Sequence, residues 1–184
     1  MKILFATGNN DKMREFERIL NNIKIEQLQL DIPEIQSIEV EEVVKFKAEY
    51  AYKEVDLPVI VEDSGLYIEA WNRLPGALIK WFESAVKSEG ICRMMKNEAN
   101  RSAIAKCCID FYDGQHNIFL GAVNGKISDK PLGENGFGWD NIFVPQKYHK
   151  TFAEMSSEEK DGISHRKIAL GKLAAFLANK NNSP

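Results

Sequence analysis

A short apolar strand opens the chain and runs directly into a polar turn and then a helix. Lys2 to Ala6 form the apolar run, and Thr7 to Lys12 read TGNNDK. The helix that follows has Asn10 or Asp11 available as its N-cap. A connecting turn alone requires neither the threonine nor the lysine, so this stretch predicts an α/β fold with a binding site at its first turn.

Strands and helices alternate along the rest of the chain. The apolar periodicities predict a helix over Val40 to Glu54, a strand over Pro58 to Glu62, helical structure over 81–99, an antiparallel hairpin of Ile104 to Tyr112 with Asn117 to Val123, and a long helix from Ser164. With 184 residues and 44% hydrophobic composition, the chain is long enough for one good core and too short for two ordinary domains. We therefore expect one domain, residues 1–184, built on a mixed sheet.

The charge balance excludes several classes of partner. The formal net charge is −3 and the pI is about 5.7, which gives no general attraction to nucleic acid or to anionic membranes. No stretch has the length and apolarity of a signal-peptide core or a membrane span. The three cysteines, Cys92, Cys107 and Cys108, lack the spacing of a metal site and the even number of a disulfide framework. We expect a cytoplasmic protein that contacts no nucleic acid and no membrane.

Lys47 interrupts the apolar face of the second predicted helix. The neighbouring positions on that face, 40, 43, 44, 48 and 51, are all valine or alanine. One interpretation is that Lys47 buries its stem and keeps its ammonium group in water. The other is that the ammonium group points into a cleft that binds an anion.

Two carboxylates, Glu62 and Asp63, come at the end of a predicted β-branched strand. The ligand crevice of an α/β sheet lies at the carboxyl ends of its strands. A simpler interpretation is that Asp63 and Ser64 only form a turn leading to Gly65. Together with the upstream Glu34, however, these residues offer hard oxygen ligands for Mg²⁺, which takes one or two carboxylates plus substrate phosphates.

The stretch Gly133 to Phe143, GENGFGWDNIF, places Phe137 and Trp139 among three glycines. Glycine allows a backbone to approach a ligand closely, and stacking on an aromatic ring is worth about 1–3 kcal/mol per base. Both a base-binding loop and a tight turn with two core aromatic residues explain this composition.

Ser164, His165 and Arg166 begin the last predicted helix. The macrodipole disfavours cations there by a few tenths to about 1 kcal/mol, so Arg166 and a charged His165 need an anion or a carbonyl ligand beside them. The simpler interpretations are that His165 is a satisfied surface histidine and that Lys160 is the solvated end of the preceding acidic helix.

Together, these stretches resemble the inosine triphosphate pyrophosphatase family, the Ham1-like enzymes that clear deaminated purine nucleotides. The resemblance runs from Phe5 to about Leu170 and rests on five motifs in the family's order: TGNNDK at 7–12, VEDSGL at 61–66, LPGALIKWF at 74–82, FGWDNIF at 137–143 and SHRKIAL at 164–170. The departures are small, with Leu78 where many relatives carry tyrosine and Asn141 where proline is common. The first motif is neither a Walker loop nor a dinucleotide fingerprint, because both glycine spacings are absent.

The resemblance implies an α/β fold with an elongated mixed sheet, flanking helices and two lobes around a central nucleotide-binding cleft, usually as a homodimer. It also implies Mg²⁺-dependent hydrolysis of a purine nucleoside triphosphate such as ITP, dITP or XTP to the monophosphate and pyrophosphate. Donors facing the 6-oxo group of such a base would stay unpaired against adenine, and mismatches of this kind can discriminate by about 10⁴.

The resemblance also assigns roles to single residues. Asp63 and Lys12 are catalytic, and Asp63 orients or deprotonates the water that attacks the α-phosphorus. Glu34 and Asp63 bind Mg²⁺, with Glu62 beside them and Glu41 or Glu42 as substitutes. The implied substrate-binding residues are Thr7, Gly8, Asn9, Asn10, Lys12, Lys47, Ser64, Phe137, Gly138, Trp139, Asp140, Lys160, His165 and Arg166. In this set the TGNNDK turn and the lysines bind the triphosphate, and Phe137 stacks on the purine. Asp140, His165 and Arg166 contact the edge of the base.

Two other functions fit parts of the sequence. A pyrophosphatase for modified pyrimidine or methylated nucleotides would share the magnesium and phosphate residues but needs a different base pocket. A non-catalytic nucleotide sensor or single-stranded nucleic-acid binder would use Phe137 and Trp139 for stacking, although the net charge of −3 disfavours the nucleic-acid version.

Overall fold

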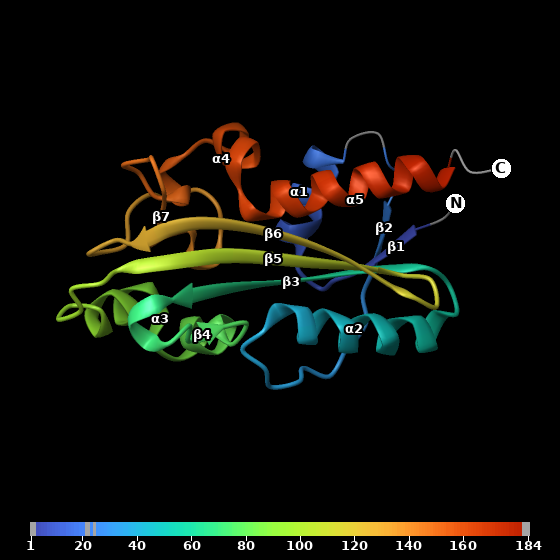
Figure 1. Ribbon diagram of the computed structural model, residues 1–184, viewed down its shortest axis with the longest axis horizontal. Helices are drawn as coiled ribbons and strands as arrows, with labels where there is room; N and C mark the ends of the chain where they lie inside the picture. Colours follow the sequence, from blue (N-terminus) through green and yellow to red (C-terminus); the bar gives the residue numbers. More distant parts are fainter. Residues whose placement is uncertain (1–2, 21–22, 24, 182–184) are drawn as a thin grey trace.

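One mixed sheet runs through the computed structural model, which describes residues 3–20, 23 and 25–181. Within these residues the sheet has seven strands: β1 (Ile3–Ala6), β2 (Ile25–Leu28), β3 (Val59–Ile68), β4 (Pro75–Gly76), β5 (Ser102–Tyr112), β6 (His116–Ile127) and β7 (Phe143–Pro145). The order is β2-β1-β3-β5-β6-β7, with β4 paired to β3; β2, β1 and β3 are parallel, and the remaining pairs are antiparallel. Figure 1 shows β3, β5 and β6 lying along the length of the molecule, which confirms the predicted elongated mixed sheet.

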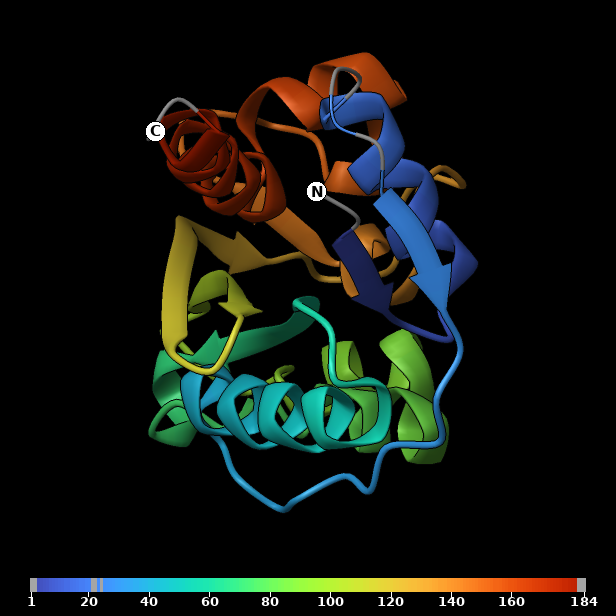
Figure 2. The ribbon, with the colours of Figure 1, turned by 90° about the vertical axis from the view of Figure 1, so that its right-hand side faces the viewer.

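Helices cover both faces of this sheet. They are α1 (Asn10–Ile19), α2 (Val40–Val55), α3 (Ile79–Met94), α4 (Ser157–Ile163) and α5 (His165–Asn181), with short 3-10 helices η1 (Glu69–Trp71), η2 (Gly138–Asn141) and η3 (Phe152–Glu154). Figure 2 shows α1 and α5 on one side of the sheet and α2 and α3 on the other. The flanking helices of the predicted fold are therefore present on both sides.

Three apolar clusters hold these layers together. On the α1 and α5 side, Phe5 and Phe16 stack with ring centroids 3.9 Å apart, next to the buried Leu170 and Leu173. The face of α2 predicted to be apolar packs against β1 and β3. A third cluster joins α3 to β7 and the 3-10 helices at the other end of the sheet. The core therefore lies on both faces of the sheet, and helix amphipathicity predicts which side of each helix it uses.

Most element boundaries agree closely with the sequence analysis, and three differ. The hairpin and the helix after Ser164 are confirmed, and Ser164 Oγ accepts a hydrogen bond from the Lys167 amide as an N-cap. The N-cap of α1 is Asn9, not Asn10 or Asp11, because its side chain accepts from two amides of the first turn. The helix predicted over 81–99 is α3, which ends at Met94 and is interrupted at Lys87, where φ is 56°.

The strand predicted to end at Glu62 continues to Ile68, so the predicted strand end and the turn at Gly65 are both wrong. β5 pairs with β3 along its whole length, from Val59 opposite Tyr112 to Ile68 opposite Ala103, and this pairing keeps the polar residues extended. A side chain at Gly65 would come within 2.9 Å of the Gly76 carbonyl carbon on β4, so glycine here allows close approach and does not mark a turn.

The other edge of β3 has a gap in its pairing. β1 pairs with β3 only at Val59 and Ile60, and β4 pairs with it only at Leu66 and Tyr67. Residues 61–65, which include the two acidic residues, lie between these two partners. The crevice expected at a strand end is therefore present at the point where the neighbouring strand β1 ends.

The three cysteines lie in the interior of the protein. Cys92, Cys107 and Cys108 are buried free thiols. Among the described helices, none is long and apolar enough to cross a membrane.

Gly121 on β6 tests how closely α5 packs on the sheet. A methyl group there would meet the His165 carbonyl oxygen and would lie 2.7 Å from the Ala169 amide nitrogen. We expect Gly121→Ala to lower the free energy of unfolding by about 1–3 kcal/mol through overpacking. Gly171 lies in α5 with open space around it, so Gly171→Ala should raise the same quantity by up to about 1 kcal/mol. Urea denaturation of both variants measures this, and equal effects would contradict the close packing.

Candidate active site

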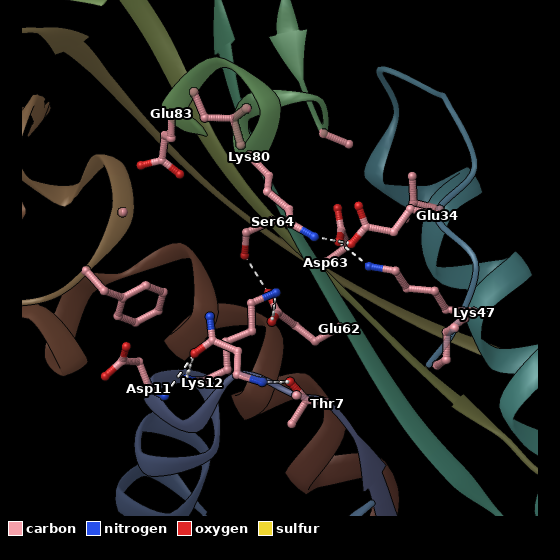
Figure 3. A pocket seen from close by; sticks show the side chains of 18 of the residues that line it. Thr7, Asp11, Lys12, Glu34, Lys47, Glu62, Asp63, Ser64, Lys80 and Glu83 are labelled. Atoms are coloured by element: carbon pink, nitrogen blue, oxygen red, sulfur yellow. Dashed lines mark hydrogen bonds and ion pairs between the residues drawn. The ribbon is translucent and has the colours of Figure 1, made fainter. Parts of the chain in front are cut away.

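A cleft of about 840 Å³ opens at the gap beside β3. Its lining comes from the turn after β1, the segment before α2, α2 itself, β3, the start of α3, η2 and the start of α5. The predicted site residues that line it are Thr7, Gly8, Asn9, Asn10, Lys12, Glu34, Lys47, Asp63, Ser64, Phe137, Gly138, Trp139, Asp140, His165 and Arg166. The fold thus brings together residues from six separate parts of the sequence, and Figure 3 shows the cleft from close by.

The turn after β1 presents the N-terminus of α1 to this cleft. Asn9 Oδ1 accepts hydrogen bonds from the amides of Asp11 (2.9 Å) and Lys12 (3.1 Å), and Thr7 Oγ1 accepts one from the Asn9 amide. Gly8 has open space around it. Helix N-termini favour anions because their amides point outward and the dipole is positive there. This end of the cleft is therefore suited to an anionic group.

Three lysines at this end each pair with a carboxylate. Lys12 lies 2.8 Å from Glu62, Lys47 lies 2.6 Å from Asp63, and Lys80 lies 2.7 Å from Glu34. Glu62 and Asp63 are neighbours on β3 and therefore point to opposite faces of the strand, Glu62 toward α1 and Asp63 toward α2. Both nevertheless line the cleft.

Lys47 lies in the apolar face of α2, and its ammonium group points into the cleft. Its side chain is 16% exposed and its partner Asp63 is 13% exposed. If Lys47 only kept its ammonium group in bulk water, a larger fraction of its side chain would be exposed. The second interpretation of Lys47, an ammonium group directed into an anion-binding cleft, is the one that fits this geometry.

Glu34 and Asp63, the predicted Mg²⁺ ligands, are turned toward the same part of the cleft (Figure 3). Each is bound to a lysine, so a cationic group already sits on each carboxylate. Burial would raise the pKa of Glu34, but Lys80 and then Lys47 outweigh it and lower the pKa. Among the described residues no group of three or more His, Cys, Asp or Glu side chains is arranged for a metal. The donors fit a magnesium ion that takes two carboxylates and completes its shell with phosphate oxygens.

A row of alternating charges, all buried except the half-buried Lys12, connects this end to the other end of the cleft. We call it the buried charge chain; its members, in order, are Lys12, Glu62, Arg166, Glu15, Lys160 and Asp140. Arg166 binds both Glu15 and Glu62, and Lys160 lies 2.7 Å from Glu15 and 2.6 Å from Asp140. The anion that the sequence analysis required beside Arg166 is therefore supplied by the protein itself.

The pairing keeps these groups charged despite their burial. Burial would raise the pKa of Glu15, but Arg166 and Lys160 outweigh it and lower that pKa to about 2. Burial also opposes ionisation of Glu62, and Arg166 and Lys12 again lower the pKa. For Lys12, burial would lower the pKa, but Glu62 and Asp63 raise it. Glu15, Glu62 and Lys12 are thus ionised near neutral pH.

The other end of the cleft is aromatic. Lys160 Nζ lies 5.0 Å and Arg166 Cζ lies 5.4 Å from the centroid of the Phe137 ring. His165 is buried beside Trp139, and Nδ1 of His165 has no hydrogen-bond partner within the described residues. Burial and the nearby Arg166 and Lys160 lower the pKa of His165 to about 3, so this histidine is neutral rather than charged or at the surface.

Several predicted substrate residues have structural contacts that the sequence did not indicate. Lys160 is buried and does not line the cleft, so it is not the solvated end of α4. Trp139 is 7% exposed and belongs to the apolar cluster around α3. Asp140 caps η2 by accepting from the Phe137 amide. The substitutes Glu41 and Glu42 lie outside the cleft lining and contact Lys106 and Ser37 respectively.

Three residues of this region carried no sequence-based role. Glu15 is one helical turn after Lys12, which puts both on one face of α1. Lys80 stands inside the quoted motif at 74–82, and Glu83 follows it by three residues on α3, so helical spacing could have indicated both. Burial and the neighbouring Asp140 raise the pKa of Glu83 to about 7.

The comparisons with known proteins agree with this arrangement. The model of the Ham1 family matches residues 3–176. This chain belongs to the Ham1 family. It is 42% identical to the dITP/XTP pyrophosphatase of Methanopyrus kandleri, with 97% of each chain covered, and 42% identical to the inosine triphosphate pyrophosphatase of Yarrowia lipolytica, covering 98% of this chain and 97% of that one. Among solved structures, the Staphylococcus aureus Ham1 protein superposes with a TM-score of 0.85 at 33% identity, covering 98% of this chain and 100% of the other. The predicted family and fold class are confirmed for this Ham1-family protein.

The raised pKa of Glu83 predicts a pH-dependent effect on stability. The pKa is 4.5 for an unperturbed glutamate and about 7 in the fold. Protonated Glu83 therefore makes its full contribution to the free energy of unfolding below pH 4.5, and this contribution is lost as the pH rises through 7. Glu83→Gln stays neutral and should raise the free energy of unfolding by about 1–2 kcal/mol near pH 8, with no change near pH 4. Urea denaturation at both pH values measures this. Glu89→Gln, on the exposed side of the same helix, is the matched control, and a gain of equal size at both pH values would contradict the prediction.

Proposed function

We propose that this Ham1-family protein is a Mg²⁺-dependent nucleoside triphosphate pyrophosphatase. It hydrolyses deaminated purine nucleoside triphosphates (ITP, dITP and XTP) to the monophosphate and pyrophosphate and so removes them from the nucleotide pool. The observation that carries the proposal is that one cleft joins an anion-binding end, with Lys12, Lys47 and Lys80, to an aromatic end at Phe137. The names of the curated relatives support the same substrates.

The anion-binding end suits the triphosphate. The amides at the start of α1 are donors for phosphate oxygens, and Lys12 adds a point charge beside them. Lys47 and Lys80 lie on the opposite side of the cleft, each on a carboxylate. Hydrolysis at phosphorus depends on positioning and charge neutralisation more than on covalent chemistry, so these cations are the groups that the reaction needs.

Glu34 and Asp63 would hold the magnesium ion, which supplies positive charge to the phosphate oxygens when it is bound. With both carboxylates holding the ion, Lys47 and Lys80 would be available to bind phosphate oxygens themselves. Asp63 also orients or deprotonates the water that attacks the α-phosphorus, and the bond between the α- and β-phosphates breaks. The monophosphate keeps the base, and pyrophosphate leaves.

The aromatic end suits the base. Phe137 stacks on the purine, with Trp139 shaping the loop beneath it. Both terminal nitrogens of Arg166 already donate to side chains of the protein, which leaves Nε, buried and unpaired within the described residues. His165 is neutral and can therefore donate or accept toward a base without a net charge.

The family resemblance also supports a homodimer as part of this proposal. Sedimentation equilibrium of the purified protein tests it, and a monomer at micromolar concentration would contradict it. The cytoplasmic location stays a prediction.

The first test is the reaction itself. Purified protein is incubated with Mg²⁺ and separately with ITP, XTP, GTP, ATP and dUTP, and ion-exchange chromatography identifies the products. We expect monophosphate and pyrophosphate from ITP and XTP, little product from ATP, and no turnover when the divalent cation is chelated. Release of diphosphate and inorganic phosphate would contradict cleavage between the α- and β-phosphates.

The same assay separates the alternatives. Preferential turnover of dUTP would favour the pyrophosphatase for modified pyrimidine nucleotides. Tight binding of ITP without any product would favour the nucleotide sensor.

Asp63→Asn tests the catalytic role of this carboxylate. The amide keeps the shape of the side chain but loses its basicity, so we expect kcat for ITP to fall at least about 100-fold while the substrate still binds. Steady-state kinetics and calorimetric titration with a non-hydrolysable ITP analogue measure the two effects. Asp129→Asn is the matched control, because the Asp129 side chain is 94% exposed and remote from the cleft. A kcat close to wild type would remove Asp63 from the mechanism.

A further inference from the structure

Glu83 is an acidic residue at the aromatic end of the cleft. It lies in the second turn of α3, lines the cleft, and places its two carboxylate oxygens 3.1 and 3.4 Å from the position that a Cβ on Gly138 would occupy. Gly138 directly follows the stacking ring Phe137 and has a φ of +60°, so both its conformation and its lack of a side chain leave room for the carboxylate. In Figure 3 the Glu83 carboxylate is well apart from Lys80 and the other labelled lysines.

Glu83 lacks the partner that the comparable carboxylates have. Every other buried or half-buried acidic side chain that lines the described part of the cleft has a cationic partner: Asp11 with Arg14, Glu62 with Lys12, Asp63 with Lys47, and Asp140 with Lys160. For Glu83, no described residue donates a hydrogen bond or forms an ion pair. Its nearest charged influence is the like charge of Asp140, which raises its pKa together with burial. A half-buried acceptor without a donor is unfavourable in the free protein and gains when a ligand brings an N–H group.

The charges around Phe137 are divided between two sides. Lys160 and Arg166, both cationic, lie over the ring of Phe137, and the neutral His165 is next to Arg166 in the sequence. Glu83 lies beyond Gly138, on α3, a different element. A base stacked on Phe137 therefore lies near Arg166 and the neutral His165 of α5, and near the acceptor Glu83 of α3.

This division matches one class of purine. A 6-oxopurine presents an acceptor, O6, next to a donor, N1–H, whereas adenine presents a donor, the 6-amino group, next to an acceptor, N1. A carboxylate that meets N1–H forms a charge-assisted hydrogen bond. The same carboxylate facing adenine would meet the lone pair of N1, and both acceptors would stay unpaired.

We propose that Glu83 accepts a hydrogen bond from the N1–H group of a 6-oxopurine base and thereby determines specificity against adenine. This inference rests on the proposed function and deepens it, because it assigns the acceptor half of base recognition to a residue of α3. Guanine also carries N1–H, so Glu83 selects 6-oxopurines as a class and does not separate ITP from GTP.

The experiment compares ITP with 1-methyl-ITP, which lacks the N1–H group, and with GTP and ATP. Values of kcat/KM are measured near pH 8, where the Glu83 carboxyl, with a pKa of about 7, is mostly ionised. For Glu83→Leu we expect kcat/KM for ITP and for GTP to fall by about 10- to 100-fold, while ATP is unchanged or improved. Wild type should prefer ITP over 1-methyl-ITP. In Glu83→Leu this preference should shrink by the same factor, because the variant has no acceptor for the N1–H group.

Matched variants separate this effect from a change in the fold. Glu83→Gln keeps a neutral acceptor, is expected to be at least as stable as wild type, and should lose less activity on ITP than Glu83→Leu. Glu89→Leu, on the exposed side of α3, should leave all the ratios unchanged. Circular dichroism and thermal melting establish that the variants are folded.

The outcomes distinguish this inference from the proposed function. If wild type turns over ITP and folded Glu83→Leu keeps both the ITP to ATP ratio and the ITP to 1-methyl-ITP ratio, then Glu83 does not read the base. If wild type turns over neither ITP nor XTP, the proposed function fails, and the role of Glu83 in it fails as well.

Discussion

The buried charge chain fixes how the two ends of the cleft face each other. Its six side chains come from α1, β3, α5, α4 and η2, and each buried charge has an opposite charge beside it. Burying an ion costs several kcal/mol, and removing one partner of a buried pair typically costs about 3–5 kcal/mol. The surrounding elements are therefore held in the arrangement that pairs every charge. Glu15 is central to it, because it joins the α5 arginine to the α4 lysine and so links the turn after β1 to the loop at Phe137.

The incomplete pairing of β3 provides the second constraint. Between β1 and β4, residues 61–65 keep their extended conformation through β5 alone. Because side chains alternate along a strand, Glu62 points toward α1 and α5 and Asp63 points toward α2. One strand segment thus serves both layers of helices: one carboxylate joins the buried charge chain, and the other meets the lysine of α2.

Local signals predicted the elements and the residues of the cleft, but not their partners. Apolar periodicity placed α2 and singled out Lys47, and cap chemistry placed the start of α5 at Ser164. The predicted end of β3 was wrong because Ser64 and Gly65 look like a turn locally, whereas pairing with β5, some 40 residues later, keeps them extended. Arg166 and Glu15 are 151 positions apart, so no spacing rule could pair them. The choice of Glu34 and Asp63 among the acidic residues came from the family resemblance, and only the fold adds the lysine that each carboxylate holds.

The three lysine–carboxylate pairs at the phosphate end compensate each other's charge in the free protein. Lys12, Lys47 and Lys80 carry three positive charges, and Glu62, Asp63 and Glu34 carry three negative ones, so the six groups sum to zero. Three compensated pairs exert little long-range attraction on small anions such as free phosphate, and they add little dependence on ionic strength to the capture of such anions. Anions that arrive without a companion cation must compete with carboxylates that already hold the lysines. At these pairs, a ligand that brings its own positive charge is therefore favoured over a free anion.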